Sequence, residues 1–247
     1  MTFTIVGRCK RTGQRGLAMA TSSPAVGNRC AFVSHAGAVG YQSIAEPRLG
    51  ALTLKLIEQG YHPTGAIKLV TETDPWFGKR QIGIVDSDGR SDAFTGENNI
   101  PWCGHIIGEN FVAMGNVLAG PQVVEAIAEG FHEKEDDILE ERLIRAIEAG
   151  RDAGGQPEGQ TSSSILTFGH QSQARCDLRV DVSEEPVKEL RRIFDWFKPL
   201  LPYFEERMTT STVPRFKDYF KDNGHVREYG KPVPVTRGGS TKFPYKG

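Results

Sequence analysis

Hydrophobic residues in the first part of the chain recur at every second position, which is the spacing of β-strands. Phe3 and Ile5 share one face of residues 3–8, and Thr12 and Gly13 form a turn signal before a second such segment. The same criteria predict a series of short strands at 16–21, 30–34, 37–42, 81–85, 90–94, 111–114, 163–168 and 178–182.

Between these strands the hydrophobic period lengthens to that of an α-helix. One predicted helix begins near Leu49 and is closed by Gly60, and a shorter one follows Pro63. Three more are predicted at 121–131, 138–149 and 187–197. Five residues on the apolar faces of these helices are expected to be buried: Leu52, Leu56, Ile127, Leu143 and Ile147.

The order of the predicted elements favours an α+β fold over a Rossmann fold, because strands and helices do not alternate one for one. Strands joined by hairpins and followed by paired helices indicate two mainly antiparallel sheets packed together, with helices on both outer faces. We expect one domain over residues 1–197. Residues 198–247 read as a C-terminal arm rich in proline and aromatic residues.

The charge of the arm distinguishes it from the domain. Residues 209–247 hold eight Lys and Arg against three Asp and Glu, a net charge of +5, so a total of -1 leaves the rest at -6. The arm is therefore expected to dock on a neighbouring subunit or to wrap its own domain, and we expect a homo-oligomer.

The composition of the 247 residues is that of a globular protein, with 38% hydrophobic and 25% charged residues. A net charge of -1 gives no general attraction to nucleic acid or to an anionic membrane. There is no apolar run of about 20 residues and no signal-peptide pattern at the start, which predicts a cytoplasmic protein.

Four scattered cysteines favour buried free thiols over a disulfide or a zinc site. Neither a metal-ligand spacing nor a phosphate-binding glycine loop is present. We therefore expect no cofactor and no metal, and a small-molecule substrate.

The pair Met1-Thr2 is the first candidate for chemistry. Removal of an initiator methionine before a small residue leaves a terminal threonine, which carries both a hydroxyl nucleophile and an amine able to act as base. The ordinary pKa of an α-amine is about 7.7–8.0, so a modest depression keeps it neutral near pH 7. Because Thr2 also begins a predicted strand, it would be held at the edge of a sheet.

Other polar residues are candidates to line a site with Thr2. Ser22 and Ser23 follow the second strand as hydroxyl neighbours, or they form only a turn before Pro24. Gln42 and Arg48 flank the loop into the first helix. Arg48 either binds a substrate carboxylate or is a surface or helix-capping arginine.

Three further candidates come from loops. His105 is read as a loop residue, either an acid/base group or a structural histidine. Gly115 and Asn116 are expected either to form an oxyanion hole or to make a plain left-handed turn. Gln160 and Ser162 lie on a glycine-rich approach to a strand.

Eight ordered stretches over residues 2–197 give the chain a resemblance to a known family: TFTIVG, GLAMATSSPAVG, GAVGYQSIAEPRLG, RQIGIVD, AFTGENNIPWCGH, GNVLAGPQVVEAI, EAGRDAGGQPEGQTSSSIL and DLRVDVSEEPVKELRRIF. They resemble domain-of-unknown-function family number 1028, a bacterial and archaeal family of the N-terminal nucleophile hydrolase-like superfamily. The resemblance implies a four-layer αββα fold and Thr2 as the nucleophile, and it carries no established substrate. The chain departs from many members at Gln156, where they have an acidic residue.

Two functions follow from these residues. In the first, Thr2 attacks a small amide or ureide, with Asn116 and His105 assisting the chemistry. In the second, the same fold binds a ligand or catalyses a non-hydrolytic reaction without a terminal nucleophile.

Overall fold

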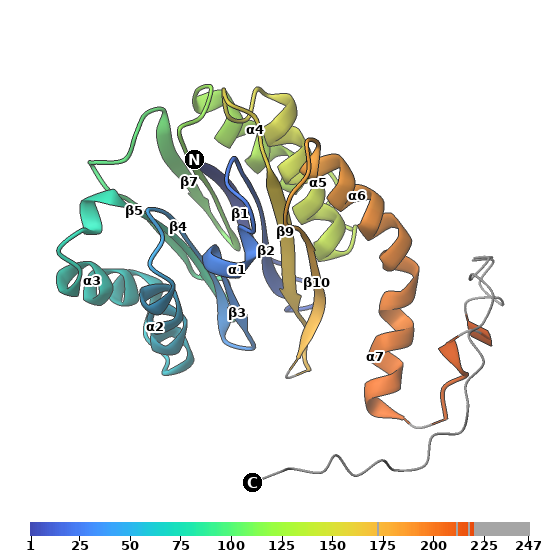
Figure 1. Ribbon diagram of the computed structural model, residues 1–247. Coiled ribbons are helices and arrows are strands. Elements are labelled where there is room, and N and C mark those ends of the chain that lie inside the picture. Colours follow the sequence, from blue (N-terminus) through green and yellow to red (C-terminus); the bar gives the residue numbers. More distant parts are fainter. Residues whose placement is uncertain (172, 211, 217, 220–247) are drawn as a thin grey trace, which may run out of the picture. The chain divides into compact units, whose positions relative to one another are not determined.

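Two antiparallel β-sheets lie face to face in the first unit of the chain, Met1–Leu201 (Figure 1). A second unit begins at Pro202. The computed structural model describes residues 1–171, 173–210, 212–216, 218 and 219. The predicted pair of antiparallel sheets is confirmed.

The larger sheet has six strands. In spatial order they are β10 (Ala174–Val180), β9 (Ser162–Phe168), β2 (Arg15–Thr21), β1 (Thr2–Arg8), β8 (Phe111–Asn116) and β7 (Cys103–Gly108). The smaller sheet has four, in the order β3 (Ala31–Ser34), β4 (Gly37–Ser43), β5 (Arg80–Asp86) and β6 (Ser91–Thr95). The N-terminal strand β1 thus lies in the interior of the larger sheet, paired on both sides.

Helices pack on the outer face of each sheet (Figure 1). Those on the larger sheet are α4 (Pro121–His132), α5 (Leu139–Asp152) and α6 (Pro186–Phe197), and those on the smaller sheet are α2 (Pro47–Glu58) and α3 (Pro63–Thr73). The remaining helical segments are short or terminal: α1 (Gly27–Cys30), η1 (Phe77–Lys79), η2 (Lys198–Leu200) and α7 (Leu201–Thr209). None of the described helices is long and apolar enough to cross a membrane.

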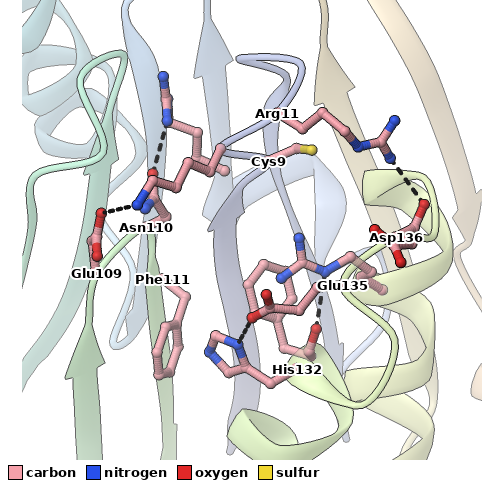
Figure 2. A pocket seen from close by; sticks show the side chains of 12 residues that line it. Cys9, Arg11, Glu109, Asn110, Phe111, His132, Glu135 and Asp136 are labelled. Atoms are coloured by element: carbon pink, nitrogen blue, oxygen red, sulfur yellow. Dashed lines mark hydrogen bonds and ion pairs between the residues drawn. The ribbon is translucent and has the colours of Figure 1, made fainter.

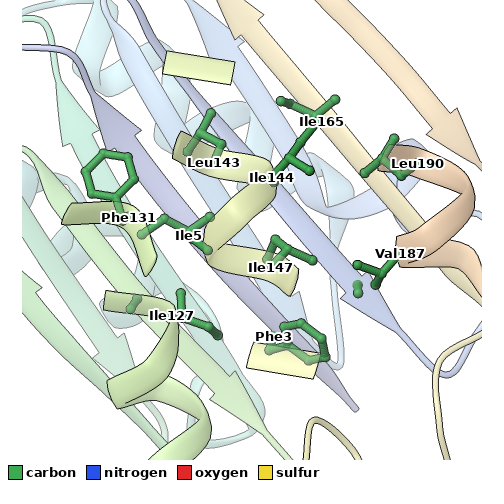
Figure 3. Packing of buried hydrophobic residues seen from close by; sticks show 14 of the residues in the cluster. Phe3, Ile5, Ile127, Phe131, Leu143, Ile144, Ile147, Ile165, Val187 and Leu190 are labelled. Atoms are coloured by element: carbon green, nitrogen blue, oxygen red, sulfur yellow. The ribbon is translucent and has the colours of Figure 1, made fainter. Parts of the chain in front are cut away.

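Three buried clusters fill the spaces between these layers. The largest joins the outer face of the larger sheet to α4, α5 and α6, and Figure 3 shows Phe3 and Ile5 of β1 among Ile127, Leu143 and Ile147. A second cluster lies between the sheets, and a third joins the smaller sheet to α2 and α3. Alternate residues of β1 therefore face the helices and the other sheet, as the period of two requires.

The burial prediction holds for three of its five residues. Ile127, Leu143 and Ile147 are fully buried, and Leu56 is partly buried against the third cluster. Leu52, in contrast, is 41% exposed.

The inward face of α2 is instead formed by Gly50, Thr53 and Ile57. A side chain at Gly50 would collide with the ring of Phe32, so the glycine lets the helix approach β3 closely. Thr53 tolerates burial because its hydroxyl donates to the carbonyl of Leu49, at 2.7 Å.

Strand β7 was not predicted, and His105 was read as a loop residue. The strand forms the edge of the larger sheet, where most of its side chains are only half-buried. Because an edge strand buries little, its hydrophobic alternation is weak in the sequence.

In the second unit Tyr203 packs against the rings of Phe204, Phe216 and Tyr219, with centroids 5.4, 5.7 and 4.7 Å away. Its hydroxyl donates to the carbonyl of Pro214, at 3.1 Å. Residues 220–247, which carry the rest of the predicted arm, lie outside the described residues.

Leu52 of α2 and Leu143 of α5 were both predicted to be buried, but their substitutions are expected to change the stability of the protein to different extents. Leu143→Ala should lower the free energy of unfolding by about 2–5 kcal/mol, because it opens a cavity in the largest cluster. Leu52→Ala should change it by less than about 1 kcal/mol, because the side chain is largely exposed. Equal losses in chemical denaturation would contradict this placement of α2.

Candidate functional site

A row of polar residues crosses the larger sheet at the end where β1 begins. Thr2 pairs with Thr21 of β2 on one side and with Asn116 of β8 on the other. Beyond them, Ser162 of β9 pairs with Thr21, and Cys103 of β7 pairs with Asn116. Residues directly opposite one another on adjacent strands project to the same face, so these five side chains lie side by side.

This row faces the smaller sheet. Thr4, two residues along β1, donates to Oε1 of Gln42 on β4 at 2.5 Å, and Val6 belongs to the cluster between the sheets. A second polar row lies opposite, formed by Gln42, Gln81 of β5 and Thr95 of β6, which are also aligned in register.

Gln81 connects the two rows, and sequence reasoning missed it. Its Oε1 accepts from Nε2 of Gln42 at 2.8 Å and from Nδ2 of Asn116 at 2.9 Å. Its Nε2 lies 2.9 Å from Oγ1 of Thr95 and 2.8 Å from the carbonyl of Gly115. The signal was present in the sequence: in RQIGIVD the two isoleucines share one face, which places Gln81 on the other buried face.

Thr2 itself is 5% exposed. Its hydroxyl oxygen lies 3.2 Å from that of Thr21, and its carbonyl accepts from Nε2 of Gln42 at 3.4 Å. The Thr21 hydroxyl donates to the carbonyl of Met1 and also lies 3.5 Å from the hydroxyl of Ser23. Thr2 is thus held through both its main chain and its side chain.

The terminal amine of Met1 is partly buried next to this site. Burial lowers its pKa, and the nearby Glu158 carboxylate opposes this effect only in part. The neutral form of an amine is therefore favoured at this end of β1.

His105 lies on strand β7 rather than on a loop. Its Nδ1 is 2.8 Å from Oγ1 of Thr95, which in turn binds Gln81. Burial lowers the pKa of the imidazole, against an opposing effect of the Asp92 carboxylate. The ring therefore belongs to the polar network of the site, in its neutral form at pH 7.

Gly115 and Asn116 lie inside β8 and do not form the turn expected as one alternative. The residue with positive φ is the next one, Val117, at 53°. Asn116 is 1% exposed and uses one amide hydrogen for Gln81. An amide nitrogen has two hydrogens, so a second donor of Asn116 remains for another acceptor.

The serines after β2 lie next to Thr21 in a segment held by hydrogen bonds. The hydroxyl of Ser162 donates to the carbonyl of Ser23 at 2.7 Å and accepts from the N–H of Val26 at 3.0 Å. Ser22 is half-buried between Thr21 and Ser23. Ser162 therefore has a structural partner on each side of its hydroxyl.

A glycine-rich segment spans this end of the sheet. At one end the carbonyl of Gly155 accepts from Ala119, just after β8, and at the other the N–H of Thr161 donates to Thr21 of β2. Because β1 lies between β8 and β2, residues 155–161 cross the start of β1. Glu158, whose charge acts on the Met1 amine, lies on this segment.

Gln156 lies on the same segment and is 3% exposed, yet neither its amide nitrogen nor its amide oxygen has a hydrogen-bond partner. Buried polar groups without partners are rare in proteins and call for an explanation. The amide of Gln160 packs against Gly155 nearby, and Gly155 has a positive φ of 48°.

Arg48 is not brought to this group. It lies in the first turn of α2, its side chain is 89% exposed, and it forms an ion pair with Glu46 at 3.0 Å. It lines a separate cavity with Asp74, Trp76 and Arg80. No group of three or more His, Cys, Asp or Glu side chains that could hold a metal ion occurs within the described part of the chain.

Replacing Gln81 with methionine should lower the free energy of unfolding by about 1–3 kcal/mol or more, because it leaves buried partners unpaired on both sheets. The exposed Gln59 offers a matched control, since Gln59→Met removes no side-chain hydrogen bond that crosses the sheets. Chemical denaturation measures both changes, and equal stabilities of the two variants would contradict the role given to Gln81.

Comparison with known proteins relates this architecture to one family. A model described as a family of unknown function, DUF1028, matches residues 2–190. Among solved structures, the crystal structure of protein SPO2555 from Silicibacter pomeroyi, which carries the same family model, is 27% identical, with a TM-score of 0.75. The match covers 88% of this chain and 92% of that one. Comparison with curated proteins gives no match. The chain belongs to the DUF1028 family of unknown function.

Proposed function

We propose that this protein is an N-terminal nucleophile hydrolase that cleaves a C–N bond in a small amide or ureide, with Thr2 as nucleophile once Met1 has been removed. The observation that carries the proposal is the position of Thr2: it begins an interior strand, is buried, and lies between the polar residues Thr21 and Asn116. A residue whose only role is to begin a strand does not require polar neighbours on both sides.

In the proposed first step the Thr2 hydroxyl oxygen attacks the substrate carbonyl carbon, and the Thr2 amine takes the hydroxyl proton. The same amine then gives this proton to the leaving nitrogen as the C–N bond breaks. This leaves an ester between Thr2 and the acyl group. Water, activated by the amine in the same way, hydrolyses the ester and restores Thr2.

Removal of Met1 also changes the bonding of Thr21. With Met1 present, the Thr21 hydroxyl donates to the Met1 carbonyl. Without it, this hydroxyl is free to bind the Thr2 hydroxyl, 3.2 Å away, or the new amine. Thr21 then orients the nucleophile or relays its proton.

The second amide hydrogen of Asn116 is the proposed donor to the oxyanion, because Gln81 fixes this amide next to Thr2. His105 acts through Thr95 and Gln81 as a positioning residue of the same network. Gln156 and Gln160, together with Ser22 and Ser23, are proposed to line the substrate site. The unpaired amide of Gln156 suits a ligand that, like an amide or a ureide, both donates and accepts hydrogen bonds.

The arrangement of layers supports the proposal. Two facing antiparallel sheets with helices on both outer faces agree with the four-layer αββα sandwich of the N-terminal nucleophile hydrolase-like superfamily. The nucleophile of that mechanism must be the first residue of the mature chain, and here it is also the first residue of β1.

The alternative is a ligand-binding or non-hydrolytic protein with the same fold. A retained Met1 is compatible with this alternative, because it would block the Thr2 amine and keep the Thr21 hydroxyl bound to the Met1 carbonyl. The two functions therefore differ in whether Met1 is removed.

Three forms of the protein distinguish these functions when they are assayed against a panel of small amides and ureides. Processed protein beginning at Thr2 should be active, and an uncleaved N-terminal extension should abolish activity because an acylated amine cannot act as base. Thr2→Ala should lower the rate about a thousandfold or more, the scale expected for loss of a covalent nucleophile.

Thr2→Ser serves as the matched control, since it keeps both the hydroxyl and the amine and should retain substantial activity. Equal activity in all forms would place the chemistry elsewhere. No turnover of any substrate by processed protein, together with saturable binding, would favour the ligand-binding alternative.

The pH dependence of the reaction should reflect a depressed amine pKa. Burial lowers the pKa of the Met1 amine, and the Thr2 amine lies further along the same buried strand. Since the base must be neutral, the rate should fall as the pH drops through this lowered pKa and should be level above it. A rate that still rises above about pH 8, the ordinary value for an α-amine, would contradict this role.

A further inference from the structure

A cavity of about 380 Å³ lies at the opposite end of β1, and Figure 2 shows the side chains that line it. It is formed by the segment that follows β1, the turn before β8 and the end of α4. Six residue-to-residue steps from Thr2 to Arg8, at about 3.3 Å each, separate it from the proposed catalytic site by about 20 Å.

Three arginines line this cavity, and each donates only one hydrogen bond to oxygen, always to an uncharged group. Arg8 donates to Oδ1 of Asn110 at 2.8 Å, and its Nε is buried without a partner. Arg11 donates to the main-chain carbonyl of Asp136 at 2.9 Å, as Figure 2 shows. Arg142, only 5% exposed, donates through Nε to the carbonyl of Phe131 at 3.0 Å.

Arg15 shows how the same fold satisfies an arginine that has only a structural role. It is 7% exposed and donates from Nε and from both terminal nitrogens to three different carbonyls, those of Ser34, Gly13 and Gly169. A guanidinium has five N–H donors, so Arg8 and Arg11 keep most of theirs available, whereas Arg142 also interacts with the Cys9 side chain and lies over the ring of Phe131.

Two of the acidic residues of the cavity are bound by side chains other than the three arginines. Glu109 binds Lys10 at 3.2 Å, and Glu135 binds Nδ1 of His132 at 2.8 Å. Asp136 is exposed and meets Arg11 through its carbonyl. The three guanidiniums therefore have no carboxylate hydrogen-bonded to them, and positive charge is in excess.

The pKa of the Cys9 thiol reflects the electrostatics of the same cavity. Burial disfavours its thiolate, but the hydroxyl and N–H of Thr12, the N–H of Arg11 and the charge of Arg142 together hold the pKa of the thiol below its ordinary value. The surroundings thus stabilise negative charge inside the cavity.

We propose that this cavity is a binding site for a small oxyanion, a carboxylate or a phosphate, held by the guanidiniums of Arg8, Arg11 and Arg142. Arginine forks match the geometry of both oxyanions and form charge-assisted hydrogen bonds with them. The volume is at the lower end of the range for ligand sites, which suits a small organic anion.

The test uses full-length protein in a Tris-chloride buffer and titrates it calorimetrically with inorganic phosphate, pyrophosphate or succinate at millimolar concentrations. At least one probe should bind, and it should also raise the melting temperature, because a ligand bound only by the folded state stabilises it. Binding by phosphate or pyrophosphate alone identifies a phosphate site, and binding by succinate alone identifies a carboxylate site.

Arg8→Gln and Arg11→Gln should each weaken binding about tenfold or more, because each removes a charged donor. Arg192→Gln is the matched control: this arginine lies on α6, is paired with Glu189 and should leave the affinity unchanged. Arg142 is buried, so Arg142→Lys is used in place of a neutral variant. The proposal is overturned if no probe binds, or if the first two variants bind as tightly as the control.

Discussion

The buried amide of Gln81 is the interaction on which the site depends. It lies between the sheets, is fully buried, and joins β5 to β4, β6 and β8 through its two polar atoms. Each partner is itself buried or half-buried, so a lost bond leaves an unpaired group that costs about 1–3 kcal/mol. The network therefore fixes the separation and register of the two sheets where β1 begins. Thr2 lies in that space, bonded to Gln42, which Gln81 holds.

The two ends of β1 differ in chemistry although they share one hydrophobic middle. At the Thr2 end, neutral amides and hydroxyls bind one another, and burial favours a neutral amine. At the Arg8 end, guanidiniums are left with spare donors around a cavity. Between them, Phe3 and Ile5 pack on the helices, while on the other face Thr4 binds Gln42 and Val6 joins the cluster between the sheets. One strand thus separates the proposed catalytic site from the proposed anion site.

Much of the fold was predictable because most elements are buried on at least one face. The hydrophobic periods of the sequence predict strands such as β1 and β5 and helices such as α4 and α5. The inward face of α2 was predicted one position away from the observed one. Gly50 faces inward because it packs against the Phe32 ring, and the hydrophobic pattern of a single helix does not show which residues pack against it. Strand β7 was missed because an edge strand buries too little to impose an alternation.

The site divides in the same way. The position of Thr2 at the start of a buried strand could be predicted from the alternation of β1, and its role as nucleophile stays a prediction. The role of Gln81 could not be predicted. Its alternation with the two isoleucines shows which face of β5 it occupies, but only the register between the sheets shows that it meets Asn116 and Gln42. Arg48 was misleading for a local reason, since Glu46 two residues earlier engages it at the start of α2.

Mass spectrometry of the N-terminal peptide tests the central claim most directly. The protein is produced at low expression level and treated with a small acylating reagent, and the peptide containing β1 is then sequenced. The account predicts a chain that begins at Thr2 and carries the acyl group on the Thr2 side-chain oxygen. A chain that retains Met1, or a reagent bound only at other residues, would contradict it.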